Sequence, residues 1–292
     1  MADSHDHHHV HQHDHAGDHA HNGKIPIDAA SFTEVNRAHW NKFAASYTSE
    51  QWQKDLVNHV NAFILTNISW IGVDFIDPAT AFEKDNDPAK TVRILDYACG
   101  PGTITHALAG RATEYIGLDL SENMVKAYNL RFNPDSDQCA ANPLEDQGEE
   151  EKLNAHAEVG NLLDPAGTPP AFDDPKYKDF DLVVVGLGFH HFRDLDLTMS
   201  RLLERLRPGG VFLIVDFVSH DAMKADDGNP AAPTVAHNGF SEQRLKQIFE
   251  GAGLTEFGMR VFGEKVMLRG LNPRELLLAK GRKPEGKQAA VL

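Results

Sequence analysis

Short apolar runs alternate with amphipathic segments through the middle of the chain. Runs of apolar or β-branched residues that predict strands lie at residues 92–96, 114–119, 156–160, 181–186 and 211–217. Segments with helical periodicity lie between them, at residues 103–110, 122–132 and 195–206. This alternation predicts an α/β fold in which helices cover both faces of a parallel sheet.

Two amphipathic helices are predicted ahead of this central region. Residues 31–48 begin with Ser31 or Thr33 as candidate N-caps, and residues 50–66 carry a second apolar stripe. The polar segment 77–90, with two prolines, predicts the connection into the main domain.

Further elements are predicted toward the C-terminus. The sequence LRPGG at residues 206–210 predicts a stop after a helix and a turn into the next strand. Ser241 is expected to cap a helix that runs to Phe249, and two more strands are expected at residues 257–262 and 276–280.

The chain is acidic, but most of the charge is confined to two segments. With 28 Lys and Arg against 43 Asp and Glu, the formal net charge of the 292 residues is −15, which is not expected of a nucleic-acid or anionic-membrane binder. Residues 1–22 contribute −4 of this charge and residues 133–152 contribute −6. The acidity therefore belongs to a tail and to an acidic insertion, and it says little about the ligand.

The N-terminal tail, residues 1–23, is a low-complexity mixture of His, Asp, Ala and Gly. Nine of the 17 histidines fall within the first 22 positions, and we expect this tail to be disordered because it has almost nothing to bury. Imidazoles and carboxylates bind Zn²⁺ or Ni²⁺, so two interpretations stand. The tail is either passive, with incidental metal affinity, or has a metal-related role.

The cysteine content and the hydropathy of the chain indicate the cellular compartment in which we expect the protein. Cys99 and Cys139 are too few for a disulfide framework, which is typical of a reducing environment. No apolar run approaches the roughly 18 residues of a membrane span, and the polar N-terminus lacks the apolar stretch of a signal peptide. We therefore expect a cytoplasmic protein with no membrane span.

A predicted strand that runs into a glycine turn and then a helix carries the strongest chemical signal. Gly100 and Gly102 let a ligand approach the backbone closely. A dinucleotide fingerprint needs glycines at positions 98, 100 and 103, but the chain has Ala98 and Thr103 there. Asp96 would repel a pyrophosphate and can pair with an ammonium group.

Asp119 ends the next predicted strand, where its carboxylate can accept hydrogen bonds from two ribose hydroxyls. Together with Asp96, it indicates a nucleoside whose arm is cationic and carries no phosphate. In order and spacing, the four segments LDYACGPGT, GLDLSENMV, VVVGLGFHHF and LRPGGVFLIVDF resemble those of class I S-adenosylmethionine-dependent methyltransferases. Within that class the chain is similar to ubiquinone/menaquinone-type and fungal small-molecule methyltransferases.

The resemblance implies a Rossmann-like methyltransferase fold, a doubly wound and mostly parallel seven-stranded sheet whose last strand is antiparallel. It further implies that residues 31–76 form an N-terminal helical lid and that residues 91–283 form the methyltransferase domain, with the acidic insertion at residues 133–152. The cofactor is then expected over the carboxyl ends of strands one to four.

The same resemblance assigns the cofactor contacts. Asp96 and the backbone at 98–100 are expected to hold the methionine moiety, Asp119 the ribose, and residues that follow Asp119 the adenine. Asn161 stands where the family often has an aspartate, and its carbonyl oxygen can still accept a hydrogen bond from the adenine amino group. The expected cofactor-binding residues are Tyr47, Asp96, Ala98, Cys99, Gly100, Gly102, Asp119, Leu120, Met124, Asn161, Leu162, Gly186 and Leu187.

Methyl transfer makes modest demands on the protein, because a sulfonium methyl group is already a strong electrophile. The protein must align the nucleophile and exclude water, and it needs a base only when the nucleophile arrives protonated. His190 and His191 are the candidate catalytic residues, with the alternative that the pair caps or packs under the following helix. His220 and His237 are weaker candidates, no metal is expected at the site, and Cys99 is expected to be a small loop residue rather than a nucleophile.

An aromatic-rich pocket is expected to bind the acceptor. The candidate residues are Trp40, Trp52, Phe189, Met223 and Phe240, with the alternative that the aromatic side chains only dock the first helices on the sheet. Such a pocket favours a hydrophobic small molecule over a protein or a nucleic acid.

The sequence leaves more than one atom possible as the methyl acceptor. Resemblance to fungal secondary-metabolite enzymes, including those that S-methylate epidithiodiketopiperazine dithiols, favours a thiol sulfur or a phenolic oxygen. A thiol with a pKa of roughly 8.5 ionises with little help, which suits a site without an obvious strong base. The alternatives are C-methylation of a quinone-type precursor and a non-catalytic protein that binds the cofactor or a metal; the oligomeric state is not predicted.

Overall fold

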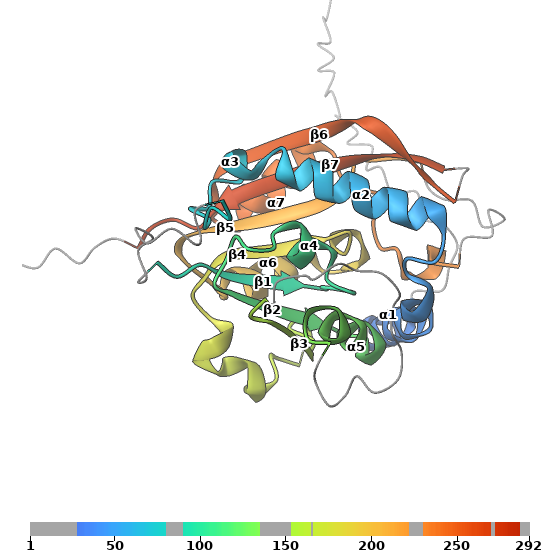
Figure 1. Cartoon of the computed structure of the whole chain (residues 1–292), viewed down its shortest axis with the longest axis horizontal. Helices are drawn as coiled ribbons and strands as arrows, with labels where there is room; N and C mark the ends of the chain where they lie inside the picture. Colours follow the sequence, from blue (N-terminus) through green and yellow to red (C-terminus); the bar gives the residue numbers. More distant parts are fainter. Residues whose placement is uncertain are drawn as a thin grey trace, which may run out of the picture.

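The computed structural model describes residues 28–79, 90–134, 153–164, 166–221, 230–269 and 272–286. The predicted disordered tail, most of the acidic insertion and Met223 lie outside the described residues. Within the described chain, helices cover both faces of a seven-stranded sheet (Figure 1). No helix in these ranges is long and apolar enough to cross a membrane.

The sheet has the topology that the resemblance implied. Its strands are β1 Arg93–Tyr97, β2 Glu114–Asp119, β3 Ala155–Val159, β4 Phe180–Gly186, β5 Leu206–Phe217, β6 Thr255–Leu268 and β7 Asn272–Arg282. They lie in the order β3-β2-β1-β4-β5-β7-β6. The first five strands are parallel, and β7 is antiparallel to both of its neighbours. The predicted doubly wound, mostly parallel sheet is confirmed.

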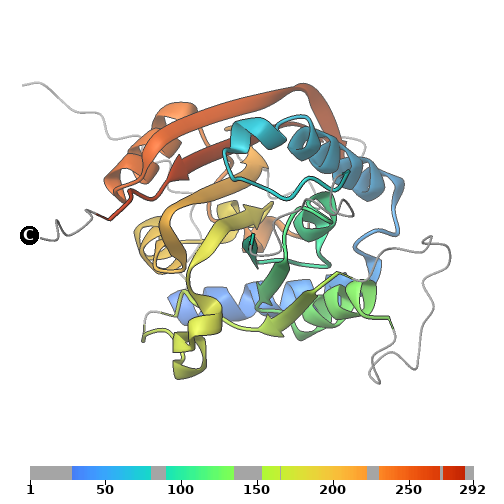
Figure 2. The same ribbon diagram turned by 60° about the vertical axis from the view of Figure 1, so that its left-hand side comes forward.

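The helices divide between the two faces of the sheet (Figure 2). They are α1 Ala29–Phe43, α2 Gln51–Leu65, α3 Ile68–Ile71, α4 Thr103–Ala107, α5 Glu122–Phe132, α6 Leu195–Leu203 and α7 Glu242–Gly251. Apolar residues of α2 to α5 form the core on one face, and those of α6 and α7 form the core on the other. Successive residues of β4 point into the two cores in turn, so this strand is buried on both sides.

The strand order reverses between β1 and β4, which are neighbours although two strands separate them in sequence. In open α/β sheets the crevice at such a reversal, outside the carboxyl ends of the strands, is where ligands bind. The chain thus places the glycine turn after β1 and the histidine pair after β4 at one edge of the sheet.

Several element boundaries differ from the prediction. Helix α1 begins at Ala29 because Asp28 caps it, accepting the Ser31 N–H at 2.9 Å, so neither Ser31 nor Thr33 is the N-cap. Ser241 caps α7 as predicted, accepting the Arg244 N–H. The LRPGG sequence was expected to be a turn, but it already belongs to β5, where a register shift near Phe180 accommodates the glycines.

The predicted helical lid also divides into two parts. Val60, Phe63 and Ile64 of α2 are at most 3% exposed and belong to the core formed with α4 and β4, so α2 is an integral layer of the domain. Helix α1 lies beside α5 instead, at the carboxyl ends of the strands (Figure 1). Helix α1 and the turn after it are placed to act as a cover.

Candidate active site

A cavity, here called the first cavity, opens where the strand order reverses. Its floor is formed by residues at the carboxyl ends of four parallel strands: Ala98 and Gly100 after β1, Asp119 and Leu120 at β2, Asn161 after β3, and Gly186 and Leu187 at β4. Phe32, Asn36 and Trp40 of α1 cover it. The sequence therefore brings most of the predicted cofactor contacts to one place.

The loop after β1 turns through three residues with positive φ, Ala98 at 56°, Gly100 at 52° and Gly102 at 83°. Strain of this kind at a non-glycine residue concentrates at ligand sites. A Cβ on Gly100 would meet no atom within 4 Å, so the loop leaves room for a ligand there. A Cβ on Gly102 would collide with the Phe132 ring, so this glycine allows α5 to pack on the loop and does not line the cavity.

Two other residues expected to touch the cofactor lie in the core. Cys99 is 5% exposed and Leu162 is fully buried, and neither lines the first cavity. Burial raises the pKa of the Cys99 thiol well above its usual range, which is consistent with a structural role. Tyr97 and Leu163, which the sequence interpretation missed, line the cavity instead.

Asp96 is a fully buried carboxylate beneath this loop. Its Oδ2 accepts hydrogen bonds from the Thr105 hydroxyl at 2.9 Å and from the Thr105 N–H at 3.2 Å, whereas its Oδ1 has no partner. Burial raises the pKa of Asp96 to about 7, against the hydrogen bonds from Thr105 that lower it. A buried carboxylate oxygen without a donor is the feature that an ammonium group would satisfy.

Asp119 lies at the end of β2 and lines the first cavity. Its Oδ2 accepts the Gly100 N–H at 2.9 Å and its Oδ1 accepts the Ser121 N–H at 2.8 Å, which fixes the carboxylate plane. A carboxylate can accept about four hydrogen bonds, so each oxygen retains a lone pair for a ribose hydroxyl. Burial raises the pKa of Asp119 to about 6.

Asn161 lines the first cavity beyond β3. Its Oδ1 accepts the Leu163 N–H at 2.9 Å, and the Tyr97 hydroxyl lies 3.5 Å from the same oxygen. The Tyr97 hydroxyl in turn accepts the Leu162 N–H at 3.2 Å. The amide is thus held in place by the chain that surrounds it, with its carbonyl oxygen already engaged.

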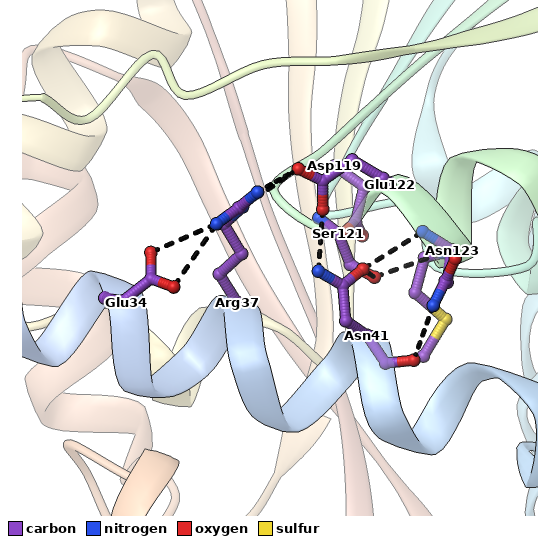
Figure 3. A network of polar contacts seen from close by, with 8 residues as sticks. Glu34, Arg37, Asn41, Asp119, Ser121, Glu122 and Asn123 are labelled. Atoms are coloured by element: carbon purple, nitrogen blue, oxygen red, sulfur yellow. Dashed lines mark hydrogen bonds and ion pairs between the residues drawn. The ribbon is translucent and has the colours of Figure 1, made fainter.

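Helix α1 is fastened beside Asp119 by a polar network (Figure 3). The Asn41 side chain accepts hydrogen bonds from the Ser121 hydroxyl at 2.6 Å and the Asn123 N–H at 3.0 Å, and it donates to Glu122 at 2.6 Å. Arg37 forms ion pairs with Glu34 and Glu122. Because Ser121 also donates its N–H to Asp119, the network joins the cover directly to the floor of the cavity.

A second cavity adjoins the first. Trp40, Tyr47, Leu187 and His191 line both cavities, so the two meet at these residues. Leu187 has a φ of 55°, the second non-glycine residue of this edge in the left-handed region. Phe43, Trp52 and Leu56 from the N-terminal helices continue the wall of the second cavity.

The histidine pair lies at this junction. His191 lines both cavities, and its Nδ1 lies 2.8 Å from the Thr234 carbonyl oxygen, so Nδ1 carries the proton and donates it. Burial, followed by the neighbouring His190, lowers the pKa of His191 well below its usual range. His191 is therefore neutral at physiological pH and a weak base.

His190 lines the second cavity and is paired with an acid. Its Nδ1 lies 2.8 Å from Oδ1 of Asp216, which is fully buried at the end of β5 and also accepts the N–H groups of His190 and Phe217. A carboxylate on Nδ1 fixes the tautomer and leaves Nε2 with a lone pair, the arrangement of an oriented general base. Asp216 was not predicted, although a single acid in the apolar run VFLIVDF is a signal that the sequence offers.

The other predicted acceptor contacts have mixed outcomes. Trp40 and Trp52 line the second cavity, as does Tyr47, and burial raises the pKa of Tyr47 to about 12. Phe189 and Phe240 do not line either cavity: both are fully buried in the core, with ring centroids 5.3 Å apart. The prediction that they contact the acceptor is corrected, because both rings turn into the face that α6 and α7 cover.

Of the two weaker candidates for catalysis, His220 and His237, only one lies at the described cavities. His220 lines the second cavity, whereas His237 does not, since its Nε2 lies 3.0 Å from the Phe192 carbonyl oxygen. Among the described residues, no group of three or more His, Cys, Asp or Glu side chains could hold a metal ion.

This sheet, with its single antiparallel strand and its cavity at the reversal of strand order, defines the class I methyltransferase fold. A family model described as a methyltransferase domain matches residues 73–256, and the chain belongs to that family. The predicted membership of the class I S-adenosylmethionine-dependent methyltransferases is thereby confirmed.

Curated relatives and solved structures agree with this family. An uncharacterized methyltransferase of Schizosaccharomyces pombe is 30% identical over 168 residues, which are 56% of this chain and 53% of that protein. A demethylmenaquinone methyltransferase of Clavibacter sepedonicus is 28% identical over 130 residues, 44% of this chain and 43% of that protein. This chain spans about half the length of the curated relatives it matches.

The fold is shared with solved structures at low sequence identity. A SAM-dependent methyltransferase from Anabaena variabilis has a TM-score of 0.56 at 15% identity, over 86% of this chain and 94% of that one. Phosphoethanolamine N-methyltransferase 1 of Haemonchus contortus has a TM-score of 0.55 at 15% identity, over 90% of this chain and 51% of that one.

Proposed function

We propose that this chain transfers the methyl group of S-adenosylmethionine, held in the first cavity, to an oxygen or sulfur nucleophile of a small hydrophobic molecule held in the second. The observation that carries the proposal is the junction of the two cavities at Trp40, Tyr47, Leu187 and His191. A nucleophile and a methyl donor held on either side of such a junction are already close and shielded from water.

The residues of the first cavity fit the methyl donor. Asp119 offers each ribose hydroxyl a carboxylate oxygen. Asp96 does not line this cavity but is buried beneath the loop that forms part of its floor, and its unpartnered Oδ1 fits the ammonium group of the methionine arm. The open space at Gly100 admits that arm, and Leu120 and Met124 offer apolar surface to the adenine. When bound, the cofactor supplies an electrophilic methyl group on sulfur, so the chain needs no nucleophile of its own.

His190 is the residue placed to accept a proton from the acceptor. Asp216 on Nδ1 stabilises the imidazolium that forms, and Nε2 is the basic atom. His191 stays neutral and orients the pair, with the two ring centroids 4.0 Å apart. A base at this position suits acceptors that arrive protonated, namely phenols and thiols, and a product of secondary metabolism is the kind of molecule that we propose.

C-methylation of a quinone-type precursor is the second candidate. The observation that favours it is the 28% identity with a demethylmenaquinone methyltransferase. A quinol also carries phenolic hydroxyls, so the same base would serve it, and only the product distinguishes the two reactions.

The test is a screen of aromatic thiols, phenols and quinols with labelled S-adenosylmethionine and the full chain. We expect His190→Gln to slow transfer to a phenol by about 100-fold, because general-base catalysis contributes about that much. Transfer to an aromatic thiol that is already ionised at the assay pH should be almost unchanged. His156→Gln, at a half-buried position of β3 that lines neither cavity, is the matched control. Binding of S-adenosylhomocysteine without transfer to any acceptor class would instead indicate a non-catalytic cofactor-binding protein.

A further inference from the structure

The second cavity has histidines in one part of its wall and arginines in another. His191 lines both cavities and so marks the end that meets the first, and the ring centroid of His190 lies 4.0 Å from that of His191. Arg269 and Arg274 line the second cavity and not the first. Among the described residues of its wall there is no aspartate or glutamate. A cavity whose described wall carries arginines and no acidic side chain favours an anionic ligand.

Arg269 is the clearer of the two cations. It lies at the end of the β6–β7 hairpin with a φ of 54°, and its guanidinium carbon is 5.6 Å from the centroid of the Trp52 ring. Arg37, Arg93, Arg207 and Arg282 each form an ion pair with an acid, but among the described residues Arg269 forms none. It is an exposed residue that lines the second cavity together with His39, whose pKa is lowered first by burial and then by the charges of Arg269 and Lys42.

The surface between the two polar regions is aromatic. Trp40, Phe43 and Tyr47 form edge-on contacts in sequence, with centroid distances of 5.8 Å and 6.1 Å, and Trp52 lies under the Arg269 guanidinium. Aromatic side chains in this arrangement present flat faces and edges to a planar ligand. A molecule that meets all three features has a planar ring, a nucleophile at the histidine end and an anionic group at the arginine end.

We infer that the acceptor is an aromatic carboxylate, whose carboxylate group pairs with Arg269 while its hydroxyl or thiol faces His190. This inference rests on the proposed function, because it places the acceptor in the second cavity. Arg269 acts as a specificity-determining residue: it selects the acid over an uncharged analogue and takes no part in the proton transfer.

The test compares acceptors that differ only in charge. The pairs are 3,4-dihydroxybenzoate with its methyl ester, and 4-mercaptobenzoate with its methyl ester. For the unaltered chain we expect kcat/KM to favour the acid by roughly tenfold, mainly through KM, since a charge-assisted hydrogen bond is lost in the ester. Arg269→Gln should bring the two acceptors to within about twofold by raising KM for the acid only, and Arg269→Lys should retain part of the preference.

Lys265→Gln is the matched control, because it removes one positive charge from β6, the strand that precedes Arg269, at an exposed position outside the cavity. It should leave the preference unchanged. An ester used as well as the acid by the unaltered chain, or a preference that survives Arg269→Gln, would overturn the inference while leaving methyl transfer established.

A binding measurement separates the two proposals. Calorimetric titration of the S-adenosylhomocysteine-loaded chain with each acid and ester reports the preference even if no methyl transfer occurs. Preferential binding of the acids without transfer would support the arginine assignment and count against the proposed reaction. Equal or absent binding of acids and esters would refute the arginine assignment.

Discussion

Asp96→Asn should raise the free energy of unfolding of the ligand-free protein, relative to the unaltered chain, by more at neutral pH than at acidic pH. The same substitution should weaken cofactor binding. Asp96 is fully buried, and burial raises its pKa from the usual 3.8 to about 7. A carboxyl whose pKa is higher in the folded state contributes stability that is complete below the unfolded pKa and is lost as the pH rises through the folded pKa. Asparagine keeps an oxygen for the two Thr105 donors but cannot ionise.

The size of the effect follows from the two pKa values. Compared with a side chain that cannot ionise, Asp96 lowers the free energy of unfolding by about 2 kcal/mol at pH 5 and by about 4 kcal/mol at pH 7.5, so the change between these pH values is about 2 kcal/mol. Any constant cost of the new amide group is the same at both pH values and cancels. Urea unfolding followed by circular dichroism at pH 5 and pH 7.5 measures this difference.

The same variant tests the functional assignment. Without the carboxylate, the ammonium group of S-adenosylhomocysteine loses its buried partner, and we expect the affinity measured by calorimetry to fall at least tenfold. Asp55→Asn, at an exposed position of α2, should change neither quantity. If the stability difference between Asp96→Asn and the unaltered chain were the same at both pH values, the raised pKa would be wrong; unchanged cofactor affinity would refute the pairing with ammonium.

Two further predictions concern the floor and the cover of the first cavity. The ionised Asp119 accepts the ribose hydroxyls and has a pKa of about 6, so protonation of this group alone should lower the affinity for S-adenosylhomocysteine roughly tenfold between pH 7.5 and pH 5, in addition to the loss caused by protonation of Asp96. Asp119→Asn should bind weakly in calorimetry and should lose about tenfold of this pH dependence while keeping the part that Asp96 contributes; an unchanged pH dependence would contradict the assignment. Asn41→Ala removes three side-chain hydrogen bonds between α1 and α5, and stopped-flow release of S-adenosylhomocysteine should accelerate about five- to tenfold. Glu34→Ala, which breaks only an exposed ion pair within α1, is its control and should leave release unchanged.

The fold was predictable because its signals are local and mutually consistent. The continuous apolar runs of β4 and β5 predict strands buried on both faces, and Ser121 and Ser241 cap the helices that follow. The errors lie where a tertiary contact outweighs a local signal. The glycines of LRPGG are typical of a turn, but hydrogen bonds with Lys283 hold Gly209 and Gly210 within the strand, at a shift in its register with β4.

The sequence predicts which residues meet at the ends of the strands, but it does not predict where their side chains point. Asp119 and Gly100 follow strands directly, and parallel strands bring their carboxyl ends to one edge, so their meeting needs no knowledge of side-chain packing. The direction in which a ring points does depend on packing. Phe189 is adjacent to His190 in sequence, yet one turns into the core of α6 and α7 and the other into the second cavity. The pairing of His190 with Asp216 joins residues 26 positions apart and has no local signature.

The residues that conflict with a stable fold gather around the first cavity. Asp96 and Asp119 are buried acids with raised pKa values, and Ala98 and Leu187 hold strained backbone conformations at the ends of β1 and β4. Residues that break local rules are expected at functional sites, and these two acids and two strained positions fit that expectation. An ammonium group would supply the partner that Oδ1 of Asp96 lacks, and ribose hydroxyls would add donors to Asp119, which already accepts two backbone N–H groups. Because those partners favour the ionised carboxylates, cofactor binding near neutral pH should release protons, and the cost of burying the two acids is then offset only in the bound protein.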